Sequence, residues 1–227
     1  MTIKSVFDII GPVMIGPSSS HTAGAARIGR MARSILGEEP KSAQIYLYGS
    51  FAKTYKGHGT DRALIGGLMG MDADDSNIKT APELAAKHGL DVEIRTGTGL
   101  EGTHPNTVHI YLTGVSGRKV FVGGSSVGGG NVLVSRINDF DVAVQGRYPT
   151  LLVEHTDIPG MVGRITTILG GSGINIAEMR TARNEKGAGA FTVIQTDQPV
   201  TEKVVTGIAG LPDIITVSKI LPFREVI

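Results

Sequence analysis

The segment TLLVEHTDIPGMVGRITTILGGSG, from Thr150 to Gly173, decides the fold of the C-terminal part of the chain. Its first six residues form a short apolar run that predicts a strand, and the TDIPG that follows predicts a turn. From Met161 to Gly170 the apolar residues recur at helical spacing, and glycines then end the helix. The segment therefore predicts a strand that leads through a glycine turn into a helix.

The downstream sequence completes this unit. Strands are predicted over Ile174–Thr181, Ala188–Thr196 and Ile214–Leu221, and a helix is predicted to open at Thr201. The order βαββαβ is that of a ferredoxin-like domain, in which both helices cover one face of the sheet.

The upstream part of the chain mixes helices and strands. Its helices are predicted over Ala23–Leu36, Asp61–Met69 and Pro82–His88, and its strands over Ala43–Tyr48, Val92–Arg95, Thr107–Leu112 and Lys119–Val122. The turn at Arg147–Pro149 separates the two parts. We therefore expect an α+β domain over residues 1–147 and the ferredoxin-like domain over residues 148–227.

The composition excludes several classes of protein. There are 22 basic and 21 acidic side chains, for a net charge of +1, and aromatic residues make up 5% of the chain. Nucleic-acid binding needs a basic footprint, so no nucleic acid is expected as a partner. No apolar run reaches the roughly 20 residues that span a bilayer, so no membrane is expected either. The stretch Met1–Ile10 lacks the apolar core of a signal peptide, and a cytoplasmic protein is expected.

Cysteine is absent from the sequence. Disulfides, thiolate nucleophiles and thiolate metal ligands are therefore excluded on this chain. An iron–sulfur cluster needs thiolates, so any cluster must be held by another chain.

The motif GPSSSHT, Gly16–Thr22, places four hydroxyls and the imidazole of His21 just before a predicted helix. A helix N-terminus offers unpaired N–H groups and favours anions, so the motif can seat a carboxylate or a phosphate. Helix capping is the alternative, although capping needs one hydroxyl rather than four.

The motif KTYKGHGTDR, Lys53–Arg62, places His58 between two glycines, in a predicted turn before a helix. An imidazole there can face a cleft, and its ordinary pKa suits proton transfer. The alternative is a solvent-exposed turn histidine.

Three further motifs carry polar or glycine-rich patterns. The HPN motif, His104–Asn106, leads toward a strand that carries His109, and the two histidines lack zinc-ligand spacing. The glycine-rich run Gly123–Asn131 matches no nucleotide-binding fingerprint, so we interpret it as a backbone wall of an active site or a tight connection. The turn Asp157–Gly163 aims backbone N–H groups at one spot, to which Asn175 can add an amide.

Together these motifs resemble a known family. The order GPSSSHT, KGHGTDRALIGGLMG, HPN and GGSSVGGGN resembles the β subunit of the iron–sulfur-dependent L-serine dehydratases over nearly the whole of Met1–Gln145. Thr150–Ile227 resembles an ACT domain, the amino-acid-sensing module of metabolic enzymes.

The resemblance implies a function. In that family the β subunit pairs with an α subunit that supplies the cysteines of a [4Fe–4S] cluster, and no pyridoxal phosphate is required. The implied reaction converts L-serine to pyruvate and ammonia, with an open iron polarising the serine hydroxyl and a base removing the α-proton. Whether His21 or His58 is the base stays open. The implied catalytic residues are His21 and His58, and the implied substrate-binding residues are Ser18, Ser19, Ser20, Thr22, Asn106 and Asn131.

The ACT resemblance implies an amino-acid ligand, serine or a relative of it, and side-by-side pairing of two chains. The implied ligand residues are Asp157, Gly160 and Val162, with Asn175 from the neighbouring domain. Two other classes stay open, a sensor without catalytic role and a regulatory domain that binds a phosphate compound in a serine-pathway enzyme.

Overall fold

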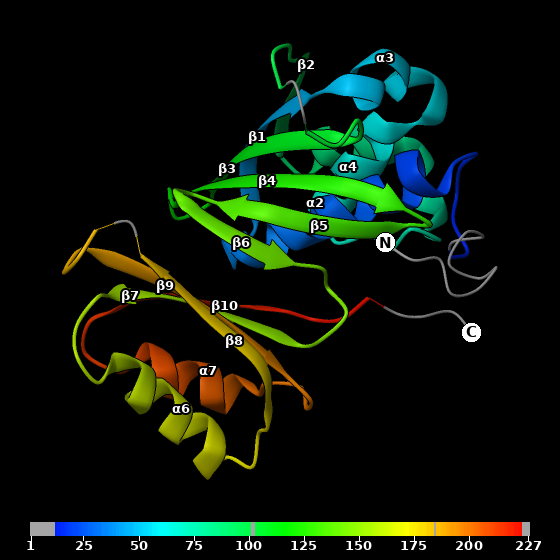
Figure 1. The fold of residues 1–227 in the computed structure, drawn as a ribbon. Helices are drawn as coiled ribbons and strands as arrows, with labels where there is room; N and C mark the ends of the chain where they lie inside the picture. Colours follow the sequence, from blue (N-terminus) through cyan, green and yellow to red (C-terminus); the bar gives the residue numbers. More distant parts are fainter. Residues whose placement is uncertain (1–11, 101–102, 184, 224–227) are drawn as a thin grey trace. The chain divides into compact units, whose positions relative to one another are not determined.

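The computed structural model describes residues 12–100, 103–183 and 185–223 of the chain. Within these residues it divides into two compact units, one of residues 12–138 with 143–145 and one of residues 139–142 with 146–223 (Figure 1). The stretch Met1–Ile10, which supported the expected location, lies outside the described residues, and the domain boundary at residue 147 stays a prediction. The predicted fold class is confirmed, with a mixed α+β part followed by a ferredoxin-like part.

The first unit is built on a six-stranded sheet in the order β2-β1-β3-β4-β5-β6. β1 and β2 are parallel, whereas β3 is antiparallel to both β1 and β4. In β3 the side chains of Val108, Ile110 and Leu112 are buried. Tyr111, which lies between the last two, is exposed. The strands are β1 (Pro40–Leu47), β2 (Asp91–Thr96), β3 (Thr107–Gly114), β4 (Lys119–Gly128), β5 (Asn131–Ile137) and β6 (Phe140–Val144).

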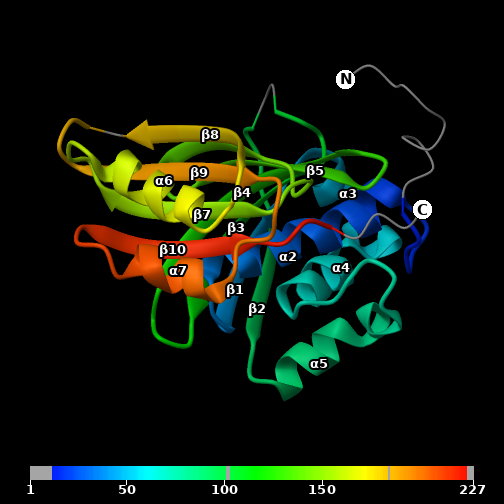
Figure 2. The same cartoon turned by 90° about the horizontal axis from the view of Figure 1, so that it is seen from below.

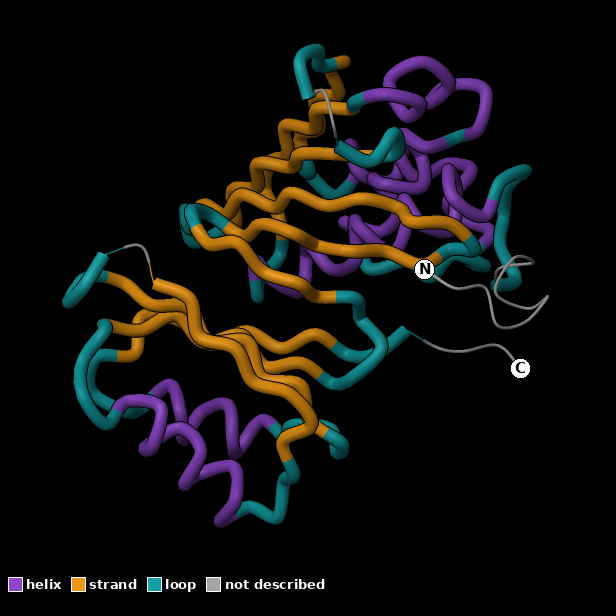
Figure 3. The backbone as a smooth tube through the Cα atoms, viewed as in Figure 1, coloured by secondary structure: helices purple, strands orange, loops and turns teal. Residues whose placement is uncertain are grey.

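Helices cover one face of this sheet (Figure 3). They are η1 (Ser19–Ala23), α2 (Gly24–Leu36), α3 (Gly49–His58), α4 (Thr60–Leu68), η2 (Ser76–Thr80) and α5 (Ala81–Lys87). The pair α2 and α4 packs backbone against backbone. A Cβ added at Gly67 would lie 2.1 Å from the carbonyl oxygen of Ala26, and one added at Gly29 would lie 2.4 Å from that of Leu64. Two glycines therefore set how closely these helices approach.

Two predictions for the first unit are wrong. The residues around His58 were predicted as a turn, but they form the end of α3, which stops at Gly59 in the left-handed conformation with φ 67°. The segment has few helix signals because only Phe51 is buried and two of its ten residues are glycines. The strand predicted over Lys119–Val122 is too short, since β4 continues through much of the glycine-rich run to Gly128, and the tight connection predicted there is the turn between β4 and β5.

The second unit has the predicted βαββαβ order. Its four strands pair antiparallel in the order β10-β7-β9-β8, and both helices lie on one face of the sheet (Figures 1 and 2). Leu151 and Ile194 of the sheet pack with Ile165 and Ile208 of the helices in one core. The elements are β7 (Thr150–Thr156), α6 (Met161–Gly171), β8 (Ile176–Arg183), β9 (Gly189–Thr196), α7 (Glu202–Ala209) and β10 (Ile214–Ile220).

Among the described residues, no helix is both long enough and apolar enough to span a membrane.

Candidate active site

The GPSSSHT motif folds into the start of a helix rather than preceding one. Ser18 is the N-cap, its hydroxyl accepting a hydrogen bond from the backbone N–H of His21 at 3.3 Å. The next five residues, Ser19–Ala23, form the π-helical turn η1 and run directly into α2. The helix predicted over Ala23–Leu36 is confirmed as α2, and η1 adds one helical turn before it. Wide turns of this kind occur mostly as single turns and often at functional sites.

Hydroxyl groups surround the imidazole of His21. Its Nδ1 lies 3.2 Å from the Oγ of Ser18 and 3.1 Å from the Oγ of Ser20. Its Nε2 lies 3.1 Å from the Oγ of Ser50, on α3. The side chain is only 9% exposed, so these hydroxyls are the polar environment of the ring.

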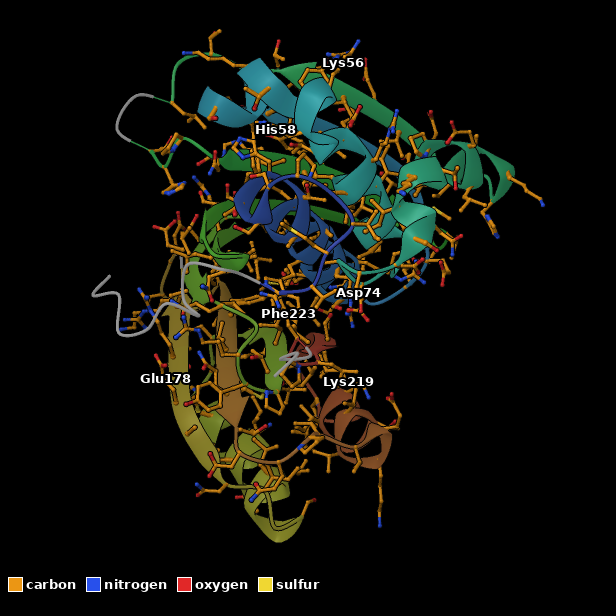
Figure 4. All side chains as sticks on the ribbon, turned by 90° about the vertical axis from the view of Figure 1, so that its right-hand side faces the viewer. Lys56, His58, Asp74, Glu178, Lys219 and Phe223 are labelled. Carbon is orange, nitrogen blue, oxygen red and sulfur yellow. The ribbon has the colours of Figure 1, made fainter. Side chains whose placement is uncertain are left out.

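His58 meets His21 from the last residue of α3. The two ring centroids are 4.6 Å apart and the rings are edge-on, while Thr22 donates from its hydroxyl to the His58 carbonyl at 3.2 Å. Figure 4 labels His58 close to the blue ribbon of η1 and α2. The Nδ1 of His58 is buried and has no hydrogen-bond partner among the described residues. His21 and His58, predicted separately as catalytic, therefore form one imidazole pair.

Burial lowers the pKa of His21 below its ordinary value, and the neighbouring His58 lowers it further. Both effects disfavour a positive charge on the ring. At neutral pH the ring of His21 is therefore neutral and can accept a proton.

The HPN motif lies against the start of α3. The Pro105 carbonyl accepts hydrogen bonds from the backbone N–H groups of Ser50 at 2.6 Å and Phe51 at 3.4 Å. The next residue, Asn106, is 9% exposed, and its Oδ1 is buried without a hydrogen-bond partner in the described part of the chain. Its carbonyl accepts from the backbone N–H of Ser126, in the glycine-rich part of β4. Asn106, predicted as a substrate contact, thus has an amide oxygen available to a ligand.

Two buried hydroxyls without partners escaped the sequence analysis. Among the described residues, Thr60 Oγ1 and Ser126 Oγ are buried and make no hydrogen bond, and both residues are 0% exposed. A Cβ added at Gly24 would lie 2.1 Å from Ser126 Oγ, so Ser126 touches the start of α2. The sequence does indicate the burial of Ser126. Val120, Val122, Gly124 and Ser126 alternate along β4, so all four lie on the same buried face of the strand. Buried polar atoms without partners are rare and call for an explanation, such as a ligand.

Two predicted substrate contacts, Ser19 and Asn131, make hydrogen bonds within the backbone framework. Ser19 lies in η1, where its carbonyl accepts from the backbone N–H of Gly24. Asn131 closes the tight connection between β4 and β5, donating from Nδ2 to the Gly128 carbonyl at 3.2 Å.

In the second unit, Asp157 lies in the loop between β7 and α6. Its carboxylate accepts from the Gly187 N–H at 3.2 Å and from Arg183 Nη1 at 3.1 Å. These two contacts, the Gly187 hydrogen bond first, lower the pKa of Asp157 below its ordinary value. Gly160, with φ 83°, is the N-cap of α6, and Val162 is half-buried in its first turn.

Asn175 lies beyond the other end of α6. Its Nδ2 donates to Asp197 Oδ2 at 2.6 Å. Since α6 has 11 residues and a helix rises about 1.5 Å per residue, the two predicted parts of the ligand site are about 16 Å apart along this helix. Asp157 and Asn175 therefore do not meet within one chain, and the contribution of Asn175 from a neighbouring domain stays a prediction.

The residues of this chain do not fit an iron–sulfur cluster. Such clusters are held mainly by cysteine thiolates, and the chain has no cysteine. Over residues 12–100, 103–183 and 185–223, no three His, Asp or Glu side chains gather into a set that could hold a metal ion.

Known proteins match the chain over both units. Residues 5–136 match the serine dehydratase beta chain family, and residues 149–212 match the ACT domain. The probable L-serine dehydratase beta chain of Bacillus subtilis (strain 168) is 46% identical over 220 residues, covering 97% of this chain and 99% of that protein. The L-serine dehydratase beta chain of Peptoniphilus asaccharolyticus is 40% identical, covering 93% of this chain and 95% of that protein.

A more distant similarity also extends over both units. The D-3-phosphoglycerate dehydrogenase of Bacillus subtilis (strain 168) is 28% identical over 201 residues, which cover 86% of this chain but 37% of that enzyme.

Proposed function

The chain belongs to the serine dehydratase beta chain family, and from that premise we propose that it is one subunit of an L-serine ammonia-lyase. The complete enzyme converts L-serine to pyruvate and ammonia, and this chain is inactive alone. The observation that carries the proposal is the imidazole pair, His21 and His58, buried among serine hydroxyls.

The partner in this proposal is an α subunit that holds a [4Fe–4S] cluster. The relatives named as beta chains support a second kind of chain, and the absence of cysteine requires that the thiolates come from it. No pyridoxal phosphate is needed. An oxygen-sensitive assembly of this kind suits a reducing compartment, so we propose a cytoplasmic enzyme.

The part of this chain in the reaction is proton transfer. Loss of the α-proton and of the hydroxyl from L-serine gives 2-aminoacrylate and water. The aminoacrylate tautomerises to an imine, and water hydrolyses the imine to pyruvate and ammonia. The imidazole pair accepts the α-proton, a contribution of about 10²–10⁴-fold for a general base. His58 is the ring that meets the substrate, since its Nδ1 has no partner in the described part of the chain, whereas both nitrogens of His21 have hydroxyl partners.

Asn106 is the substrate contact with the most support. Its buried amide oxygen accepts hydrogen bonds, so it suits the ammonium group or the hydroxyl of serine rather than the carboxylate. The carboxylate suits the N-terminal turn of η1, since a helix N-terminus favours an anion. The remaining proposed substrate contacts are Ser18, Ser19, Ser20, Thr22 and Asn131.

The second unit is proposed as the sensor and as the site of self-association. An amino acid, serine or a relative of it, binds at the β7–α6 loop beside Asp157, Gly160 and Val162. Asn175 of a second copy completes the site. The separation of Asn175 from the loop along α6 supports a site shared between two chains.

A second candidate function is a sensing subunit without a catalytic role, which binds an amino acid or a phosphate compound for a serine-pathway enzyme. The similarity of both units to D-3-phosphoglycerate dehydrogenase favours this candidate. Calorimetry with L-serine against phosphate and phosphoserine shows which kind of ligand it binds. The removal of His21 and His58 separates this candidate from the lyase, because a sensing subunit keeps the turnover of the assembled enzyme intact.

The experiment that tests the proposal measures pyruvate formation from L-serine under anaerobic conditions. The purified chain is expected to give none. The chain together with a cysteine-bearing α subunit is expected to be active and brown. Turnover by the single chain would overturn the proposal.

A further inference from the structure

Ser50 contacts two motifs that are far apart in the sequence, GPSSSHT and HPN. It is the second residue of α3, and its Oγ lies 3.1 Å from Nε2 of His21. Its backbone N–H donates to the Pro105 carbonyl at 2.6 Å. One residue thus joins the HPN motif to the imidazole of the GPSSSHT motif.

The backbone around Ser50 is held by close contacts. Gly49 has φ 55°, and a Cβ there would lie 2.5 Å from the Pro105 carbonyl oxygen, so only glycine allows this approach. One turn later, Thr54 donates from its hydroxyl to the Ser50 carbonyl at 2.9 Å. The backbone that carries the Ser50 side chain is therefore held from both sides.

A hydroxyl suits the Nε2 of a ring that gains and loses a proton. It donates to a bare ring nitrogen and accepts from a protonated one, so it pairs with either state. A carboxylate would instead favour the charged ring. With Ser18 and Ser20 at Nδ1, the Ser50 hydroxyl leaves neither nitrogen of the buried His21 unpaired.

We propose that Ser50 is a positioning residue, whose hydroxyl holds the His21 ring edge-on against His58 through Nε2. The inference rests on the proposed function, in which the imidazole pair accepts the proton of the substrate. It adds a residue that touches neither the substrate nor the reacting atoms. It also explains what the HPN motif does besides presenting Asn106, since the Pro105 carbonyl sets the start of α3.

The test compares four variants of the full chain. Ser50→Ala removes the hydroxyl. Ser50→Thr keeps it, and Ser50→Val has the shape of threonine without it. Thr54→Val is the matched control, since it removes a hydroxyl of the same helix that bonds a backbone carbonyl instead of an imidazole.

The first readout is the imidazole ¹⁵N spectrum of His21 as a function of pH, which needs neither the partner nor activity. Wild type, Ser50→Thr and Thr54→Val are expected to share one His21 tautomer and one titration curve. Ser50→Ala and Ser50→Val are expected to change both. His21 signals and titration unchanged in Ser50→Ala would overturn the inference. If Ser50→Ala does not fold, the comparison of Ser50→Thr with Ser50→Val decides.

The second readout is steady-state kinetics of the complex with the α subunit. Ser50→Ala is expected to lower kcat about 10–10²-fold, the cost of misplacing a catalytic group, and to shift the pH profile of kcat. KM is expected to stay within about threefold, because Ser50 does not bind substrate. A loss confined to KM contradicts the inference. If even the wild-type complex gives no pyruvate, the proposed function fails, while the His21 spectra still test Ser50.

Discussion

The imidazole pair of the first unit and the Asp157 loop of the second unit differ in the charge that their surroundings favour. His21 is 9% exposed, and its burial lowers the pKa of the ring, so that the buried group is kept neutral. The Asp157 side chain is 24% exposed, and its hydrogen bonds lower the pKa of the carboxyl, so that this half-buried group is kept charged. The first arrangement preserves a base, and the second preserves an anion that a ligand or a cation can recognise.

The two regions also differ in how completely their polar atoms are paired. Around the imidazole pair, His58 and Asn106 have buried polar atoms without partners in the described part of the chain. In the second unit, the Asp157 carboxylate and the Asn175 amide both have partners within the chain. Since unpaired buried atoms are costly, the first region is the stronger candidate for a site that a ligand completes.

The largest expected effect comes from removing either imidazole of the first region. His58→Ala and His21→Ala are each expected to lower kcat of the assembled enzyme about 10²–10⁴-fold, because each removes part of the proton acceptor. The matched control is His88→Ala, which removes an exposed histidine that bonds the Leu84 carbonyl of its own helix. Steady-state pyruvate formation measures all three. A loss of about tenfold or less in both site variants would favour the sensing candidate instead.

The next effect compares helix packing in the two units. Gly67→Ala places a Cβ 2.1 Å from the Ala26 carbonyl oxygen, so it is expected to lower the free energy of unfolding by about 1–3 kcal/mol. Gly163→Ala in α6 meets no atom within 4 Å. It is expected to raise the free energy of unfolding by about 0.5–1 kcal/mol, because alanine favours a helix over glycine. Urea unfolding checks both. Equal effects would mean that α2 and α4 do not pack as closely as described.

A smaller effect concerns pH and the neutral ring of His21. Its pKa is lower in the folded chain than the ordinary value of about 6.5, so the ring binds a proton more readily after unfolding. Its contribution to stability is therefore complete above about pH 6.5 and is lost as pH falls through the lowered pKa. Urea unfolding at about pH 7.5 and about pH 5.5 is expected to show a smaller acid loss in His21→Gln than in wild type. An equal acid loss in the two proteins would contradict a lowered pKa.

The smallest effect concerns the charge of Asp157. Its lowered pKa means that the carboxylate stabilises the fold above its ordinary pKa, and that this stability is lost as pH falls through the lowered value. Asp157→Asn is expected to show a flatter decline of the unfolding temperature in acid, with little change at neutral pH, since exposed ion pairs contribute little. Thermal unfolding across the acid range measures this. A large loss of stability at neutral pH would show that the loop depends on Asp157 for its fold.

The sequence predicted the second unit far better than the first. In the second unit, apolar runs such as Thr150–His155 alternate with clear turns, and each strand or helix carries its own periodicity. In the first unit, α3 was not predicted because Phe51 is its one buried residue. Tertiary contacts stabilise this helix where local sequence preference does not. The second half of β4 escaped because glycines hide the alternation that continues from Val120 to Ser126.

The site was predicted in pieces but not as a whole. His21 and His58 could be singled out because each stands in an unusual motif, yet nothing in the sequence joins the two motifs. Their contact depends on how α3 packs against η1. Ser50 could not be predicted at all, since a lone serine after a strand has no distinctive pattern.

The most direct test of the account is a double-mutant cycle on the imidazole pair in the assembled enzyme. The quantity is kcat/KM for L-serine in His21→Ala, His58→Ala and the double variant. If the two rings act as one proton-accepting unit, the double variant loses about as much as the worse single variant. Losses that multiply, or turnover that survives in all three variants, would contradict the account.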